Sequence, residues 1–248
     1  MRYRSLLVIL LVSLMVSPVL TAEKTGDEII RKVDANMTFD TARFQSEMVI
    51  YIGEEVRRKT FVSYAKGRTN SFTEFLSPPR DKGVKYLKIE DNMWMYLPSV
   101  EKIIKIAGHM LRQSMMGSDF SYEDALESAK LLEKYQAELV SEEVLEDSPC
   151  YVIDLTARVK EVTYYRRRIW VDKNLFIPLK EELFAVSGKK LKVMTLGNMK
   201  KFGTRFYPTY MVMRDLLRKN SKTEMIISKV EFDLKIPEEI FTQRSLKK

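Results

Sequence analysis

The chain has 248 residues, with 42 lysines and arginines against 34 aspartates and glutamates, which gives a net charge of +8. Its single cysteine excludes an internal disulfide, and one cysteine with one histidine supplies too few ligands for a zinc site of three or four. The basic residues are spread thinly along the chain, which argues against nucleic acid as a partner.

The first 22 residues have the three parts of a secretory signal peptide. Arg2 and Arg4 form a basic region, a short apolar run follows them, and Pro18 precedes a small residue at Ala22 that suits cleavage. The run is short for a membrane span, and an uncleaved anchor is the alternative. No cysteine directly follows the cleavage site. We therefore predict an exported periplasmic protein that is not itself a lipoprotein.

The mature chain opens with a helical pattern and then changes period. Ile29, Ile30 and Val33 recur at helical spacing behind Thr25, a residue suited to cap a helix. In "FQSEMVIYI" apolar side chains then alternate with Gln and Glu, which is typical of a half-buried strand. About a dozen such segments follow, separated by turn signals such as "KGRTN", "SPPRDKG" and "VSGKK".

This series of strands predicts a mainly β fold with few helices. Strands joined by short turns indicate an antiparallel meander that closes into a barrel or half-barrel. No linker, low-complexity tract or repeat of fixed period divides the sequence. One domain over residues 23–248 is therefore expected.

The sequence contains no convincing catalytic site. A hydrolase would have to use His109, the only histidine, with Ser114 and Asp119 nearby in the sequence. Closeness in sequence says little about triad geometry, and a polar residue at the edge of a helix is the simpler interpretation of His109. No glycine-rich phosphate loop is present. We expect neither catalysis nor a metal or cofactor.

Methionines recur at alternating strand positions. Methionine is unbranched and polarizable, so it suits surfaces that accept apolar partners of varying shape. We predict an apolar barrel interior that holds a long apolar ligand, with ordinary core packing as the alternative. The strand residues expected to line it are Met48, Ile50, Met93, Met95, Met211 and Met213.

Three stretches of the sequence resemble a known family. They are "SPPRDKGVKYLKIEDNMWMYLPSVEKIIKIAGHMLRQSMMGSDFSYED" (residues 77–124), "IWVDKNLFIPLKEELFAVSGKKLK" and "IPEEIFTQRSLKK". These are similar to the outer-membrane lipoprotein-sorting family, the LolA-like periplasmic carriers. The resemblance implies one incompletely closed antiparallel β-barrel, with an N-terminal helix, a short helical lid or plug and a cavity for acyl chains. Members of this subgroup also resemble accessory proteins of RND-type exporters, so the implied cargo is a lipoprotein or a free lipid.

The stretch around Gly117 predicts a lid over that cavity. "GHMLRQSMM" favours a short helix that stops at Gly117, and Ser121 with Asp124 forms a capping-box pattern that begins a second helix. Two stiff pieces around Gly117 as a hinge fit a lid, and a helix pair that completes the core is the alternative. The side chains expected over the cavity are Met110, Met115, Met116 and Phe120.

The run "RRRIW" places arginines on both faces of a predicted strand. Arg166 and Arg168 share one face, and Arg167 lies on the other. We predict Arg166 and Arg168 as candidates for contact with lipid headgroups, and the alternative is that both rows end in water.

Together these patterns predict a carrier of acyl chains that makes transient contact with membrane surfaces, and the resemblance adds an RND-type exporter as an expected partner. Two rival functions stay open. One is an envelope sensor, scaffold or exporter subunit that binds a protein with the same half-barrel, and the other is a hydrolase that uses His109.

Overall fold

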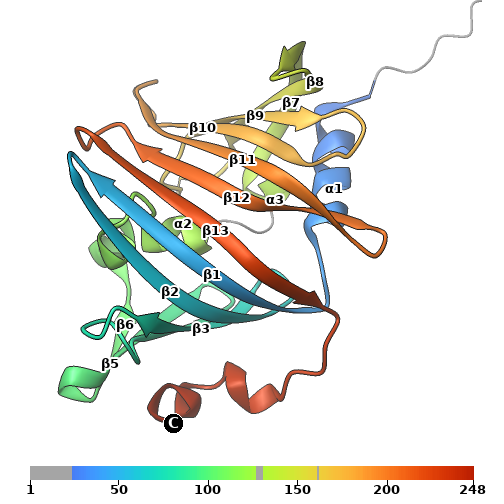
Figure 1. Ribbon diagram of the computed structural model, residues 1–248. Coiled ribbons are helices and arrows are strands. Elements are labelled where there is room, and N and C mark those ends of the chain that lie inside the picture. The colour runs from blue at the N-terminus through green and yellow to red at the C-terminus, as the bar shows by residue number, and fades with distance from the viewer. Residues whose placement is uncertain (1–23, 127–130, 161) are drawn as a thin grey trace, which may run out of the picture.

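The computed structural model of the chain describes residues 24–126, 131–160 and 162–248 (Figure 1). The signal peptide predicted at residues 1–22 lies outside the described residues. Within the described ranges, no helix is both long enough and apolar enough to span a membrane.

Thirteen strands form one antiparallel sheet, which confirms the predicted mainly β fold with an incompletely closed barrel. The first six are β1 (Thr41–Ile52), β2 (Glu55–Lys66), β3 (Asn70–Ser77), β4 (Lys85–Ile89), β5 (Asn92–Leu97) and β6 (Lys102–Ile106). The others are β7 (Tyr135–Leu145), β8 (Ser148–Ala157), β9 (Arg166–Asp172), β10 (Pro178–Phe184), β11 (Lys190–Phe202), β12 (Arg205–Asp215) and β13 (Ser221–Phe232).

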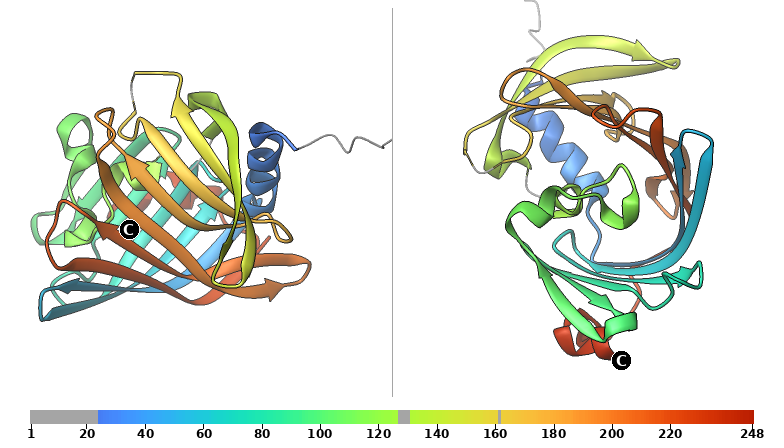
Figure 2. Two further views of the ribbon diagram at one scale, coloured as in Figure 1. Left: turned by 90° about the horizontal axis from the view of Figure 1, so that it is seen from above. Right: turned by 90° about the vertical axis from the view of Figure 1, so that its left-hand side faces the viewer.

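The strand order explains why the barrel stays open. Neighbouring strands along the chain pair with each other from β1 to β6 and from β7 to β13, and β1 pairs with β13 to join the two halves. The edge strands β6 and β7 lie at opposite ends of this order. The right panel of Figure 2 shows the sheet curling around the elements inside it.

Helix α1 (Gly26–Met37) packs inside the curve of the sheet. Its predicted cap is confirmed, because the Thr25 backbone N–H donates to Glu28 at 2.9 Å and the Glu28 N–H donates to the Thr25 hydroxyl at 3.3 Å. Ile29, Ile30 and Val33 pack in one cluster with apolar residues of β7, β8 and β9. The helix therefore fills one half of the concave side.

The C-terminal segment covers part of the convex side. Two short 3₁₀ helices, η4 (Glu238–Phe241) and η5 (Gln243–Lys247), pack Phe241 and Leu246 against Phe72 and Leu87 of β3 and β4. The neighbour of Leu87 in sequence, Tyr86, belongs to the inner cluster, so the two clusters lie on opposite faces of β4.

An aromatic cluster lies at the end of the sheet where β1 begins. Its ring pairs have centroids 5.4 to 6.2 Å apart and meet largely edge to face. The members are Phe39, Phe44, Phe202, Tyr207 and Phe232. Phe44 shares the inner face of β1 with Met48, so these rings pack inside the barrel at this end.

Candidate functional site

The chain between the two edge strands crosses the concave side of the sheet. Residues 107–126, here called the cover segment, contain the 3₁₀ turns η2 (Gly108–Arg112) and η3 (Met115–Gly117) and the helix α2 (Tyr122–Leu126). Helix α3 (Leu131–Lys134) then leads into β7. Figure 2 shows the cover segment, in green, inside the curve of the sheet.

The prediction of one short helix over "GHMLRQSMM" is wrong in detail, because two separate 3₁₀ turns, η2 and η3, occupy this stretch. The backbone is non-helical at Gln113 and Ser114 between η2 and η3, and Ser114 forms a β-bridge with Ser121. Gly117 has φ +79°, as expected of a glycine that ends a turn. The capping box of the second helix is confirmed, with Ser121 N–H donating to Asp124 at 2.6 Å and Asp124 N–H donating to Ser121 at 3.2 Å.

The cover segment packs its methionines against the sheet. Met110, Met115 and Met116 lie against a buried cluster contributed by β1 to β6. Tyr122 of α2 contacts the same cluster through its hydroxyl, which lies 3.4 Å from the Tyr86 hydroxyl and 3.9 Å from the Met95 sulfur. The cover segment thus shields this half of the concave face from water.

The predicted lining residues all come together on the concave side. Met48, Ile50, Met93 and Met213 are almost fully buried, and Met95, Met110, Met115, Met116, Phe120 and Met211 are half-buried. One row of methionines crosses three neighbouring strands. Met48 of β1 pairs with Met225 of β13, and Met225 pairs with Met211 of β12. Whether these side chains bind a ligand stays a prediction.

Asp119 fastens the cover segment to β13 through a buried carboxylate. Ser221 and Thr223 each donate a hydroxyl hydrogen bond of 2.6 Å to this carboxylate, and the Asp215 backbone N–H donates at 3.2 Å. The Asp119 N–H in turn donates to the Thr223 hydroxyl at 2.9 Å. Because Asp119 is only 1% exposed, all of these groups depend on one another for hydrogen bonds.

Two further polar contacts hold the same segment. Arg218 donates to the carbonyls of Gly117 at 3.2 Å and Ser118 at 2.5 Å. Asp124 accepts from Lys192 and from the Tyr164 hydroxyl, both at 2.6 Å. Burial, followed by the adjacent Asp124 carboxylate, raises the pKa of Tyr164, so its hydroxyl stays protonated as a donor.

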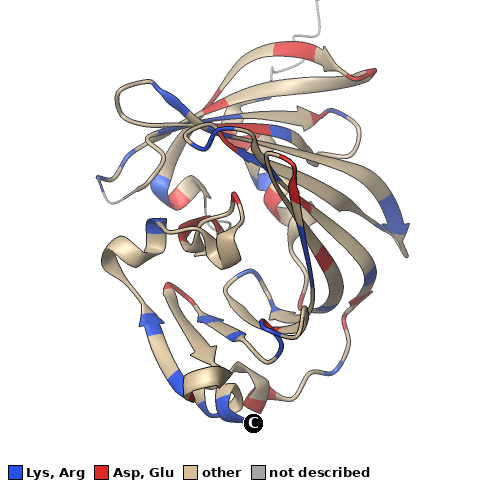
Figure 3. Cartoon of the chain, turned by 60° about the vertical axis from the view of Figure 1, so that its left-hand side comes forward, with Lys and Arg blue, Asp and Glu red and all other residues tan. Residues whose placement is uncertain are grey.

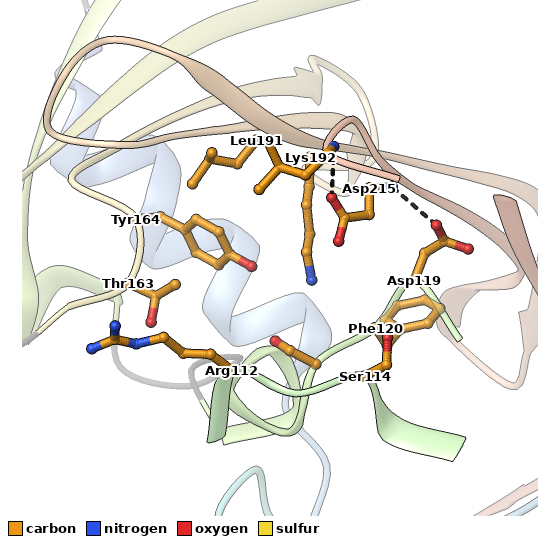
Figure 4. Close-up of a pocket in the computed structure, with 11 residues that line it drawn as sticks. Arg112, Ser114, Asp119, Phe120, Thr163, Tyr164, Leu191, Lys192 and Asp215 are labelled. Atoms are coloured by element: carbon orange, nitrogen blue, oxygen red, sulfur yellow. Dashed lines mark hydrogen bonds between the residues drawn. The ribbon is translucent and has the colours of Figure 1, made fainter. Parts of the chain in front are cut away.

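These anchors surround a pocket of about 190 Å³ (Figure 4). Arg112 and Phe120 line it from the cover segment, Thr163 and Tyr164 from the β8–β9 connection, and Lys192 from β11. The Thr163 hydroxyl is buried and has no hydrogen-bond partner within the described residues. The pocket therefore combines an apolar wall with polar groups that could orient a ligand headgroup.

The polar anchors were missed by the sequence interpretation. Lys192 precedes Met194 by two residues, and Thr223 precedes Met225 by two residues, so each continues an inward-facing row with a polar side chain. That break in an apolar row is the signal that could have identified them. Nothing in the sequence indicates Asp119 as the partner of Thr223, because the two residues lie 104 positions apart.

The arginine run divides between the faces of β9 as its alternation predicts. Arg166 and Arg168 both form ion pairs with the Asp154 carboxylate. The shorter distance is 2.7 Å, between Arg168 Nε and Asp154 Oδ1. Arg167 is buried and donates to Glu181 at 2.6 Å. The headgroup role of Arg166 and Arg168 stays a prediction.

The three residues of the hydrolase alternative do not form a hydrogen-bonded chain in the described structure. His109 is exposed, Ser114 donates its hydroxyl to the Ser118 carbonyl at 2.7 Å, and Asp119 is occupied by β13. No observation therefore favours this function.

Lys88 on β4 lies beneath α2 and makes the stability of the fold depend on pH. Its ammonium donates to the carbonyls of Ala125 at 2.8 Å and Leu126 at 3.4 Å. Burial, followed by repulsion from Arg68, lowers the pKa of Lys88 from 10.5 to about 8. Between these values the unfolded chain binds more protons than the folded chain, so stability rises with pH.

We expect the stability of the parent relative to Lys88→Met to rise by about 2–3 kcal/mol between pH 8 and 10.5. Urea unfolding at several pH values measures this difference. Lys82→Met, at an exposed position, is the control and should follow the parent. A difference between parent and Lys88→Met that stays constant with pH would show that the Lys88 pKa is not lowered.

The geometry defines a half-barrel that encloses a methionine-rich face, and known proteins share the half-barrel fold. A family model described as "Uncharacterized protein" matches residues 67–248, more than half of the chain, and the chain belongs to that family. No curated protein matches. A DUF1329 family protein from Desulfovibrio piger is 24% identical, with a TM-score of 0.83 over 89% of this chain and 97% of its own.

Two other solved structures are similar over 90% of this chain at 24% identity. A domain from Vibrio parahaemolyticus, provisionally named an outer membrane lipoprotein-sorting protein, has a TM-score of 0.82 and is covered over 98% of its length. The LolA superfamily protein NE2245 from Nitrosomonas europaea has a TM-score of 0.75 and is covered over 100%. The resemblance predicted from the sequence is confirmed at the level of the fold, which is LolA-like.

Proposed function

We propose that the protein is a carrier that holds an acyl chain of a lipoprotein or of a free lipid against the concave face, beneath the cover segment. One observation carries this proposal. The cover segment packs Met110, Met115 and Met116 on the concave face, yet in the described structure it joins the sheet through side-chain contacts and not through a strand ladder. Such a segment moves outward without breaking sheet pairing.

The free energy available to such a carrier is large. A buried CH₂ group contributes ~0.8 kcal/mol, so a palmitoyl-length chain gains on the order of 10 kcal/mol before ordering costs. Met48, Ile50 and Met93 lie under the cover segment, so the acyl chain reaches them only when the segment moves. Gly117 is the proposed hinge of this movement, and Met116, at φ +56°, is a strained neighbour that favours a change of conformation.

The proposed place of action is the periplasm. The basic, apolar and small-residue parts of residues 1–22 support export and cleavage, and the LolA-like fold agrees with an envelope role. N-terminal sequencing of the mature protein should therefore begin near Glu23. Intact Met1 in a membrane fraction would contradict this assignment.

The proposed partners are an RND-type exporter and a membrane surface, with which contact is transient. A scaffold function is the second candidate, because β7 is an edge strand that pairs with β8 on one side only within the described residues, and its Val140 and Val144 side chains are 40% and 73% exposed. An open edge of this kind accepts a strand from another protein. A protein partner captured equally well after delipidation would favour the scaffold over the carrier.

Replacing Met115 and Met116 together with Ser should weaken binding of a fluorescent fatty acid about tenfold, because each change removes apolar contact with the chain. Probe displacement measures the affinity, and far-UV circular dichroism checks the fold. The matched control is Met37→Ser with Met199→Ser, since neither methionine belongs to the cluster beneath the cover segment. If the folded variant with Met115→Ser and Met116→Ser binds and exchanges the probe as the parent does, the cover segment is ordinary core packing and not a lid.

A further inference from the structure

Three hairpin connections at one end of the sheet form a surface of unusual composition. They span residues 158–165 (residue 161 lies outside the described residues), 185–189 and 216–220 and are here called the hairpin rim. The antiparallel order places these three connections at the end where β1 ends and β13 begins. This end faces the viewer in the right panel of Figure 2.

The hairpin rim exposes apolar side chains that a soluble surface normally avoids. Ten large apolar side chains of the described chain are strongly exposed, and the rim carries five of them. They are Val159 (38%), Tyr165 (42%), Val186 (79%), Leu216 (49%) and Leu217 (58%). Each of the three connections carries at least one of these side chains, so the exposure belongs to the rim as a whole.

The rim is also strongly basic. The sequence of its three connections holds five basic residues and one acidic residue, a net charge of +4, whereas the five turns at the opposite end of the sheet sum to −2. Figure 3 shows lysines and arginines on the hairpins at this end. Its exposed basic side chains that form no ion pair within the described residues are Arg158, Lys160, Lys189 and Lys219.

The rim contributes residues to two pockets beside the candidate site. A second pocket, of about 490 Å³, lies between the first two connections and is lined by Lys160, Tyr165 and Val186. Thr163 lines both this pocket and the smaller pocket at the cover segment. Leu217 also lines the smaller pocket. A surface that bound the rim would therefore contact residues that line both pockets.

We propose that the hairpin rim docks on an anionic phospholipid leaflet. The basic side chains bind headgroup phosphates, and the exposed valines and leucines enter the outer part of the leaflet. The combination of positive charge with exposed apolar side chains distinguishes a membrane surface from a purely charged partner. This inference rests on the proposed carrier function and adds the surface through which cargo enters or leaves.

The test is co-sedimentation of the mature protein with vesicles of phosphatidylcholine alone or with phosphatidylglycerol. We expect association with the anionic vesicles only, weakened by added salt. The combination Arg158→Gln, Lys160→Gln and Lys189→Gln should weaken it at least about tenfold, because each basic residue near the leaflet contributes to binding. Val186→Ser with Leu216→Ser should weaken it in the same direction.

Two matched controls separate the rim from general charge and apolarity. Lys200→Gln, Lys235→Gln and Lys247→Gln remove the same charge from exposed positions outside the rim, and Val140→Ser with Val144→Ser removes apolar surface from β7. Both controls should bind vesicles as the parent does. Equal losses in controls and rim variants, or full binding by the rim variants, would overturn the assignment.

Binding of a fluorescent fatty acid without vesicles distinguishes this inference from the carrier function. Rim variants should keep the parent affinity for the probe, since their changed residues do not belong to the cluster beneath the cover segment. If the parent binds vesicles through the rim but binds no probe, the docking surface stands and the carrier function fails. If rim variants lose probe binding and vesicle binding together, the rim is not a separate docking surface.

Discussion

Replacing Asp119 with alanine is expected to lower the free energy of unfolding by about 3 kcal/mol, because the change leaves buried donors without an acceptor. The Ser221 and Thr223 hydroxyls and the Asp215 N–H all donate to this carboxylate. The same change detaches the cover segment from β13, so a bound fatty-acid probe should exchange faster than in the parent. Urea unfolding and stopped-flow displacement measure the two effects.

Asp40→Ala is the control for Asp119, since Asp40 is exposed and forms no side-chain hydrogen bond among those of the described chain. It should stay within about 0.5 kcal/mol of the parent, as is usual for a surface position. An Asp119→Ala protein with the stability and probe exchange of Asp40→Ala would show that the carboxylate does not hold the cover segment.

Replacing Gly26 with alanine should destabilise the fold by about 2 kcal/mol, although alanine is normally the better helix former. A Cβ at Gly26 would lie 2.8 Å from the Ala137 carbonyl carbon and 2.8 Å from the Glu138 nitrogen, both backbone atoms of β7. Backbone atoms of a strand cannot move aside as a flexible side chain does. Helix α1 must therefore shift away from β7 and loosen the cluster around Ile29 and Ile30.

Gly197→Ala provides the comparison, because a Cβ at Gly197 meets only a Tyr210 side-chain atom at 4.0 Å. We expect this substitution to be neutral or slightly stabilising, since alanine loses less backbone entropy than glycine on folding. Thermal unfolding of both variants measures the difference. Equal melting temperatures for Gly26→Ala and Gly197→Ala would disprove close contact between α1 and β7.

The strands and the first helix were predictable because their signals are local. Each half-buried strand alternates apolar and polar residues, as Met48 and Ile50 show on β1, and Thr25 with Glu28 caps α1 within four residues. The half-barrel was predicted from these patterns, but the pairing that joins its two halves was not predictable from them. That pairing is between β1 and β13, and no local periodicity records a partner so distant in sequence.

The candidate site was predictable in its apolar part and not in its polar part. Met93 and Met95 lie on the predicted strand, and Met115 packs in the same cluster, because apolar side chains at regular spacing gather on one face. The anchors Asp119 and Lys192 depend on contacts between distant segments. A polar residue in an apolar row indicates that a partner exists but does not identify it.

Native mass spectrometry of the protein purified from its own envelope fraction tests the carrier function most directly. The account predicts a population heavier than the mature chain by the mass of one acylated molecule, lost on delipidation and restored by adding lipid. The variant with Met115→Ser and Met116→Ser should carry less of this mass than the control with Met37→Ser and Met199→Ser. The mature mass alone for the parent, with no lipid regained after addition, would contradict the function proposed for the concave face.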